Sequence, residues 1–172
     1  MKSISVDMDG VLADVYSQFI TMHAAEFGKV YTMDEVSGFE EFEKFPNGRT
    51  YVNSDGFFLN APVMEDCQRV LYNLNEAYQV YIVSAAMEFP NSLVEKQLWL
   101  NQHFPFISWQ QMVFCGSKQI IKADIMIDDH FKNLNFFTGE TILYTQPHNK
   151  FADNGVHKRV DNWIDIERLL LT

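Results

Sequence analysis

Ser-Val-Asp-Met-Asp-Gly-Val-Leu-Ala-Asp, residues 5–14, is the stretch that decides the fold of this 172-residue chain. Ile4 and Val6 predict a short strand over residues 4–6, and Asp7 and Asp9 follow it with one residue between them. Alternate side chains of an extended chain share a face, so both carboxylates would project the same way. Gly10 permits a sharp turn and the close approach of a ligand. Neighbouring carboxylates repel each other, and a bound divalent cation offsets that repulsion.

An isolated Asp-x-Asp pair also has an ordinary explanation. Asp often hydrogen-bonds the nearby backbone in turns, without any ligand. The functional interpretation therefore depends on partner residues at the ends of later strands.

Composition excludes several classes of protein. Apolar residues make up 47% of the chain and aromatic residues 15%, which predicts one folded domain with a sizeable core. The formal net charge of −10 disfavours binding to a nucleic-acid polymer. Cys67 and Cys115 form no metal or redox motif, so we expect two reduced thiols and a cytoplasmic location. No apolar run approaches membrane-spanning length, and Asp7 comes before a signal-peptide core could form.

Hydrophobic periodicity predicts helices and strands in alternation after the first strand. Asp14 is the expected N-cap of the first helix, Gly28 its stop, and His23 a packed residue on its apolar side. Ser92 and Glu95 are expected to form a capping box. The predicted helices cover residues 14–27, 64–77, 92–102 and 162–171, with a short helical piece at 133–137. The predicted strands cover residues 78–83 and 112–115, lie within 123–127, and cover 141–144.

Residues 29–60 differ in character from the rest of the chain. They are rich in aromatic residues and contain Pro-Asn-Gly and Asp-Gly turns. The segment is too long for a connector and predicts a small inserted subdomain with one or two short helices, near 33–45 and 50. Most of its aromatic residues would form its own core, while Phe57 and Phe58 are candidates for stacking on a planar ligand.

Polar residues follow three later strands. Ser84 and Ala85 follow one strand, Lys118 follows another, and Asp128 and Asp129 follow a third. A hydroxyl group beside free backbone N–H groups suits a phosphate. Each signal has an ordinary explanation when taken alone, as a turn residue or a surface lysine.

The alternation of strands and helices predicts an α/β fold, a doubly wound parallel sheet of the Rossmann type. Ligands of such folds bind beyond the carboxyl ends of the strands. Because all the polar residues described above lie at such ends, we expect them to form one site.

These features, in this order, resemble the four motifs of the haloacid dehalogenase-like (HAD-like) superfamily of phosphohydrolases. Within the superfamily the chain is most similar to the 5′(3′)-deoxyribonucleotidase family. That similarity rests on the run at residues 7–14, Gly-Phe-Phe at 56–58, Glu95-Lys96 with Trp99, and Lys118 ten residues before the acidic pair. The resemblance implies a HAD-like catalytic core, residues 1–28 and 61–172. A small helical cap, residues 29–60 with part of the helix at 14–27, would be inserted after the first strand.

The resemblance also implies roles for the acidic residues. Asp7 would be the nucleophile that forms an aspartyl phosphate, and Asp9 would be the general acid and base. Mg²⁺ would bind Asp7, the backbone carbonyl of Asp9, and either Asp128 or Asp129.

The remaining roles concern the substrate. Ser84, with Ala85 beside it, would bind the phosphate, Lys118 would neutralise its charge, and the cap would select the nucleoside. The expected activity is Mg²⁺-dependent hydrolysis of (deoxy)ribonucleoside monophosphates to nucleoside and phosphate. The expected partner is a small-molecule nucleotide, not a membrane or a nucleic-acid polymer, and a homodimer is left open.

The chain departs from the family pattern at two places, and three alternatives stay open. Family members carry Arg where this chain has His130, and Thr-Ser where it has Val83-Ser84; both differences bear on substrate identity. The first alternative is a HAD phosphatase for another phosphomonoester, such as a sugar phosphate. The second is a receiver-like module, although receivers lack the large insert. The third is a non-catalytic phosphate-binding module, which would not need a second acid at Asp9.

Overall fold

The computed structural model describes residues 1–172 and contains one six-stranded sheet. Every neighbouring pair of strands is parallel, and the order is β3-β2-β1-β4-β5-β6. The predicted α/β fold is therefore confirmed, with the two acid-bearing strands, β1 and β4, side by side at its centre. The strands are β1 (Ser3–Val6), β2 (Gln79–Ser84), β3 (Met112–Phe114), β4 (Ile125–Asp128), β5 (Glu140–Tyr144) and β6 (Lys158–Val160).

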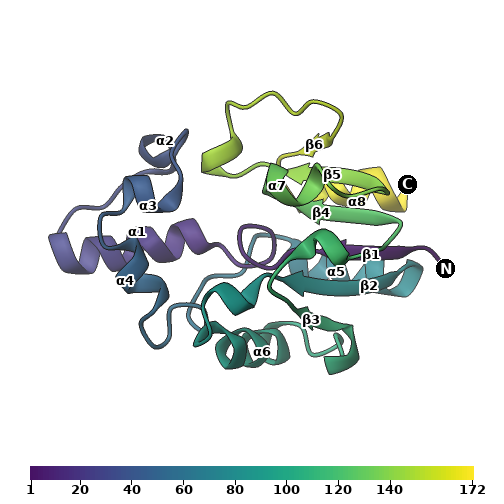
Figure 1. Cartoon of the computed structure of the whole chain (residues 1–172), viewed down its shortest axis with the longest axis horizontal. Helices are drawn as coiled ribbons and strands as arrows, with labels where there is room; N and C mark the ends of the chain where they lie inside the picture. The colour runs from purple at the N-terminus through teal and green to yellow at the C-terminus, as the bar shows by residue number, and fades with distance from the viewer.

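Helices of two groups accompany the sheet (Figure 1). The helices beside the sheet are α5 (Cys67–Ala77), α6 (Ser92–His103), α7 (Phe131–Leu134) and α8 (Trp163–Leu171), of which α5 and α8 pack against each other. Beyond the carboxyl ends of the strands lie α1 (Val15–Phe27), α2 (Met33–Val36), α3 (Glu41–Lys44) and α4 (Gly48–Val52). Short 3₁₀ turns complete the chain: η1 (Ala86–Glu88), η2 (Trp109–Gln111), η3 (Lys118–Ile120) and η4 (Pro147–Asn149).

The helix α1 joins the sheet to the other cap helices. The Asp14 carboxylate accepts a hydrogen bond from the Ser17 amide at 2.9 Å, and Gly28 ends the helix with φ +69°, as predicted. Phe19 of α1 lies 5.2 Å from the Phe45 ring and 4.8 Å from the Phe57 ring. The cap is thus built around α1, and its aromatic residues form one core with those of the sheet.

Local predictions in the cap and before α5 are partly confirmed. His23 is buried against aromatic rings, as predicted. The insert contains three short helices where one or two were expected, and α5 begins at Cys67 rather than at residue 64.

Two features of the rest of the chain correct the sequence predictions. The strand β6 was not predicted, because only one residue of its Lys-Arg-Val sequence is buried and no apolar pattern marks it. The prediction of a capping box at Ser92 and Glu95 was wrong, since the Ser92 hydroxyl donates to the Ala86 carbonyl at 3.1 Å. The Glu95 carboxylate instead accepts hydrogen bonds from the cap, as described below.

The chain enters and leaves the cap at adjacent points. The Asp14 amide donates to the Pro62 carbonyl and the Met64 amide to the Leu12 carbonyl, both at 2.8 Å. Nearby, the buried indole of Trp99 donates to the Ala61 carbonyl at 2.8 Å. Backbone hydrogen bonds therefore join the two connections at the edge of the core.

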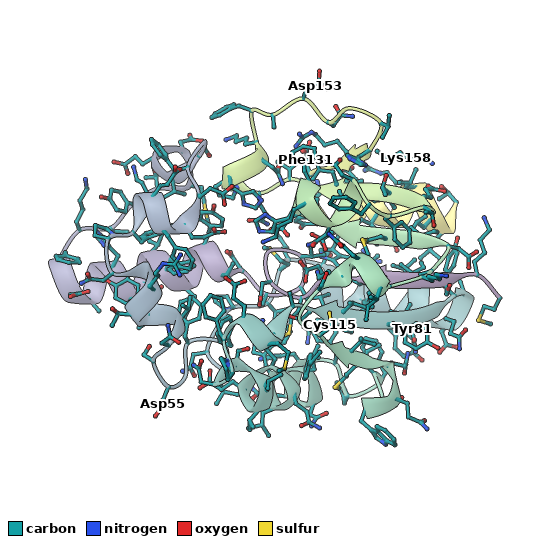
Figure 2. All side chains as sticks on the ribbon, in the orientation of Figure 1. Asp55, Tyr81, Cys115, Phe131, Asp153 and Lys158 are labelled. Carbon is teal, nitrogen blue, oxygen red and sulfur yellow. The ribbon has the colours of Figure 1, made fainter.

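Figure 2 places Asp55 at the cap side of the molecule and Lys158 on the edge strand β6. Both cysteines, Cys67 and Cys115, are free thiols. None of the helices has the length and apolar character that crossing a membrane requires.

Candidate active site

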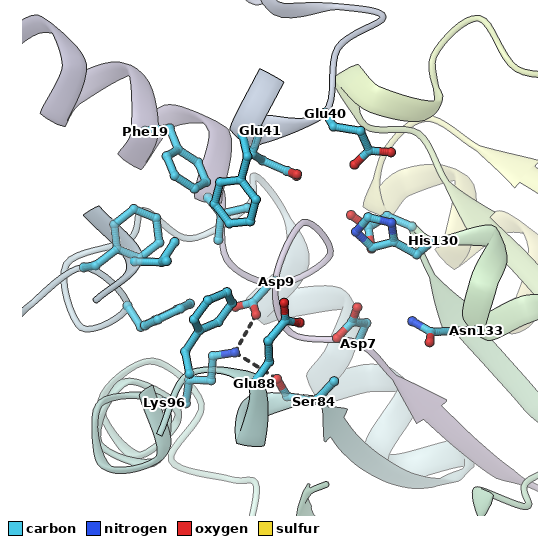
Figure 3. A pocket seen from close by; sticks show the side chains of 18 of the residues that line it. Asp7, Asp9, Phe19, Glu40, Glu41, Ser84, Glu88, Lys96, His130 and Asn133 are labelled. Carbon is cyan, nitrogen blue, oxygen red and sulfur yellow. Dashed lines mark hydrogen bonds and ion pairs between the residues drawn. The ribbon is translucent and has the colours of Figure 1, made fainter. Parts of the chain in front are cut away.

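A cavity of about 330 Å³ lies between the carboxyl ends of the central strands and the cap (Figure 3). Eight of the nine residues predicted for the site line it, and only Asp128 lies behind its wall. The eight are Asp7, Asp9, Phe57, Phe58, Ser84, Ala85, Lys118 and Asp129.

Lys118 is buried between two carboxylates. Its Nζ lies 2.7 Å from Asp7 Oδ1 and 2.6 Å from Asp128 Oδ2. Burial alone would lower the pKa of Lys118, but Asp128 and Asp7 raise it above its usual value, so the ammonium stays charged. Burial raises the pKa of Asp7 to about 6, against the opposing effect of Lys118. The ion pair of Asp7 with Lys118 and its hydrogen bond from the Met8 amide both fall on Oδ1, which leaves Oδ2 as the oxygen without such a partner.

The two acids at the end of β4 differ in their hydrogen bonds: both oxygens of Asp128 have partners, whereas one oxygen of Asp129 has none. Asp128 accepts from the His130 amide and the Asn133 side chain on Oδ1, both at 2.9 Å, and from Lys118 on Oδ2. Asp129 Oδ1 is buried and has no hydrogen-bond partner. Burial raises the pKa of Asp129 well above its usual range. Asp129 therefore has an oxygen available to a ligand, and Asp128 does not.

Gly10 makes room for Asp129. Its φ is +76°, and a Cβ atom at this position would overlap Asp129 Oδ2. The glycine of the first motif is thus required by the carboxylate of the last one as well as by the turn.

The buried acids suit a divalent cation. Carboxylate oxygens of Asp7, Asp128 and Asp129 lie within 4.8 Å of one another. An all-oxygen set that includes an unpaired buried oxygen, Asp129 Oδ1, is the kind of site that a hard divalent cation occupies. The Asp9 side chain is not part of this group, and the contact expected of Asp9 was through its backbone carbonyl.

Lys96 is a site residue for which sequence reasoning gave no role. Its buried Nζ lies 2.5 Å from Asp9 Oδ2 and 3.0 Å from Ser84 Oγ, and 4.5 Å from the centre of the Phe58 ring. Asp9 Oδ1, by contrast, is buried without a partner. The sequence spacing could have indicated that Lys96 is buried, because Lys96 lies on the same face of α6 as Trp99 and Leu100. A buried lysine needs an anion beside it.

The neighbouring Glu95 holds the cap. Its carboxylate accepts three backbone N–H groups of the loop that returns from the cap, from Gly56 at 2.6 Å, Phe58 at 3.0 Å and Leu59 at 3.2 Å. Consecutive residues of α6 therefore bind the cap and the carboxylate of Asp9. Phe57 and Phe58 belong both to the hydrophobic core, where they are almost fully buried, and to the wall of the cavity.

Cap residues that the sequence did not single out complete the opening. Glu40, Glu41 and Arg49 line it from the cap side, and Figure 3 shows both acids opposite His130. Nothing in the residue pattern distinguished these charges from a solvated face.

Solved structures identify the class of this fold. A haloacid dehalogenase family hydrolase from Deinococcus radiodurans, solved with bound phosphate and sodium, matches with a TM-score of 0.64 at 14% identity over 99% of this chain and 95% of its own. A haloacid dehalogenase-like protein of unknown function from Agrobacterium tumefaciens matches with a TM-score of 0.64 at 12% identity over 99% and 98%. The fold is that of the HAD-like hydrolases, as the sequence predicted.

Sequence comparison identifies the family within that class. The family described as "5' nucleotidase, deoxy (Pyrimidine), cytosolic type C protein" matches residues 1–172. The 5'(3')-deoxyribonucleotidases of Bacillus subtilis strain 168 and of Bacillus phage SPbeta are each 40% identical over 99% of this chain and 99% of their own. The chain belongs to this family, and it is a hydrolase of phosphoric monoesters.

Proposed function

We propose that this chain hydrolyses deoxyribonucleoside monophosphates to nucleoside and phosphate, with Mg²⁺ as cofactor and Asp7 as nucleophile. The relatives named as 5'(3')-deoxyribonucleotidases support the substrate class. The observation that carries the mechanism is that lysines hold one oxygen of Asp7, of Asp9 and of Asp128, whereas Asp9 Oδ1 and Asp129 Oδ1 are buried without a hydrogen-bond partner.

Mg²⁺ would be held by Asp7 and Asp129 and would supply charge neutralisation of the phosphate. Asp128 fits a supporting role, since its oxygens already accept hydrogen bonds from Lys118, Asn133 and the His130 amide.

In the first step, Asp7 attacks the phosphorus atom and the ester bond to the nucleoside oxygen breaks. Lys118 remains bound to Asp7 Oδ1, which leaves Oδ2 as the attacking oxygen. Asp9 gives a proton to the leaving oxygen from Oδ1, its oxygen without a partner, while Lys96 holds Oδ2.

In the second step, Asp9 takes a proton from water, which then cleaves the aspartyl phosphate and frees Asp7. Ser84 assists in both steps. Its Oγ accepts from Lys96, so its own hydrogen is free to donate to a phosphate oxygen.

The cap is proposed to select the nucleoside through Phe57 and Phe58, with Ala85 at the phosphate end of the cavity. A stacked base would add to the aromatic contacts already present, at about 1–3 kcal/mol per base. The cytoplasmic location expected from the sequence stays a prediction, and the homodimer stays open.

The test is phosphate release from a panel of phosphomonoesters, with and without Mg²⁺. We expect release from dUMP and dTMP, with Mg²⁺ only, and little release from sugar phosphates. Activity confined to sugar phosphates would refute the nucleotide assignment and leave the phosphatase assignment standing. Asp9→Asn tests the proposed general acid, and this variant should lose turnover while retaining the fold.

A further inference from the structure

Two histidines and a glutamate meet beside the cavity, which Glu41 and His130 line, and they have no role in the proposed reaction. Glu41 comes from the cap helix α3, His130 from the segment after β4, and His148 from η4. One possible ligand atom from each lies within 4.8 Å of the other two. The two imidazole rings are stacked, with centres 4.3 Å apart and planes at 13°.

The hydrogen bond behind His148 fixes where its proton lies. Its Nε2 is 3.0 Å from the Asp129 carbonyl oxygen, and a carbonyl only accepts, so Nε2 carries hydrogen. Nδ1 is then free to present a lone pair toward Glu41 Oε1 at 3.7 Å. A backbone carbonyl behind one ring nitrogen is the usual support of a metal-binding histidine.

Tyr16 does not relieve the resulting repulsion. Its hydroxyl oxygen is 3.4 Å from His148 Nδ1, but it donates its hydrogen to the Phe39 carbonyl at 3.0 Å. Burial, together with Glu41, Glu40 and Asp129, raises the pKa of the phenol, so it stays neutral. A lone pair, a phenol oxygen and a carboxylate therefore face one another, and a cation between them is the arrangement that stabilises all three.

We propose that Glu41, His130 and His148 form a second metal site, for a transition-metal ion of the zinc type. Two imidazoles and a carboxylate suit Zn²⁺, whereas Mg²⁺ prefers an all-oxygen set such as the acidic cluster below. Zinc bonds of about 2.1 Å separate ligand atoms by roughly 3.4 Å. The His148–Glu41 distance of 3.7 Å is already close to that value, and changes of side-chain rotamer would bring the third ligand atom, within 4.8 Å of the other two, into range.

The origin of the ligands gives the site a consequence. Glu41 belongs to the cap, and both histidines belong to the core, so a bound ion ties the two together across the opening of the cavity. Substrate and product then exchange more slowly, and zinc inhibits turnover even in excess Mg²⁺. The site does not depend on which phosphomonoester the enzyme hydrolyses.

The experiment measures Zn²⁺ binding to the metal-stripped full chain in excess Mg²⁺, by calorimetry. We expect one zinc ion per chain, and visible absorption bands of nitrogen-bound Co²⁺ when Co²⁺ replaces it. Glu41→Gln and His130→Gln should weaken binding by about 10-fold or more. Glu40→Gln, which removes the same charge one residue away, is the matched control and should bind as the wild type does.

Three results would overturn the proposal. One is the absence of zinc uptake in excess Mg²⁺. Another is competition in which Mg²⁺ displaces the zinc, since the ion would then occupy the acidic cluster. The third is equal affinity in wild type, Glu41→Gln and His130→Gln. Circular dichroism verifies the fold of each variant, and slower hydrogen exchange at the cap loop near Phe39 with zinc reports closure.

Discussion

The core half and the cap half of the site are held together by different means. On the core side, Lys118 is enclosed by Asp7 and Asp128, all three almost fully buried and carried by the sheet or the turns next to it. On the cap side, Lys96 bonds Asp9, whose side chain is 33% exposed, and Glu95 bonds a loop. The comparison teaches that the charges around the nucleophile Asp7 are fixed by sheet topology, whereas the proton donor Asp9 and the cap loop depend on a few contacts of α6.

The largest expected effect is on turnover, from a substitution in the core half. Asp7→Asn removes the nucleophile but keeps the shape of the side chain, and kcat should fall by about 10⁴-fold or more. The measurement is phosphate release from dTMP with Mg²⁺. Near-normal turnover in a variant verified by mass spectrometry would remove Asp7 from the mechanism.

Lys118→Met tests the burial of the core charges. It leaves Asp7 and Asp128 without their shared cation, and the free energy of unfolding should fall by about 3–5 kcal/mol. Denaturant unfolding of the metal-free protein measures it. A loss below that of the cap-side variant described next would contradict the comparison.

Lys96→Met is the matched change on the cap side. Asp9 can take up water through its exposed side, so we expect a smaller loss of stability, about 1–2 kcal/mol. Turnover should fall because Lys96 no longer holds the Oδ2 atom of Asp9. Equal losses of stability in Lys96→Met and Lys118→Met would show that the two halves are not distinct.

The pH dependence of stability gives a further test of the core half. The pKa of Asp7 rises from 3.8 to about 6 in the folded, metal-free chain, so folding favours its protonated form. The corresponding stability is fully present below about pH 4 and is lost as pH rises through about 6. Stability of the EDTA-treated protein, followed by thermal unfolding from pH 4 to 7, should therefore decline less steeply in Asp7→Asn. Parallel curves for the two proteins would contradict this cause.

The smallest effect on turnover concerns the cap. Glu95→Gln keeps an acceptor oxygen but loses the charge that three backbone N–H groups share, at a cost of about 1–2 kcal/mol. KM for the nucleotide should rise more than kcat falls, because the cap loop with Phe58 loosens. Glu76→Gln, on the exposed side of α5, is the control. An unchanged KM would separate this contact from substrate binding.

The same comparison explains what the sequence alone revealed. Strand ends of a parallel sheet must meet at one edge, so Asp7, Ser84 and Asp129 could be brought together from their positions in the chain. Glu95 was assigned to a local cap, because spacing cannot reveal a partner 39 residues away. The short edge strand β6 carries no apolar pattern, and the pairing of Glu41 with His148 depends on how the cap folds back over the core.

The adjacent connections near Ala13 and Val63 have an evolutionary consequence. A segment whose ends start and finish beside each other is a natural point for insertion, deletion or exchange of sequence. The span between Asp14 and Pro62 can lengthen, shorten or be replaced while the sheet retains its register and its charges. Substrate preference in this lineage is thus free to diversify without rebuilding the hydrolytic machinery.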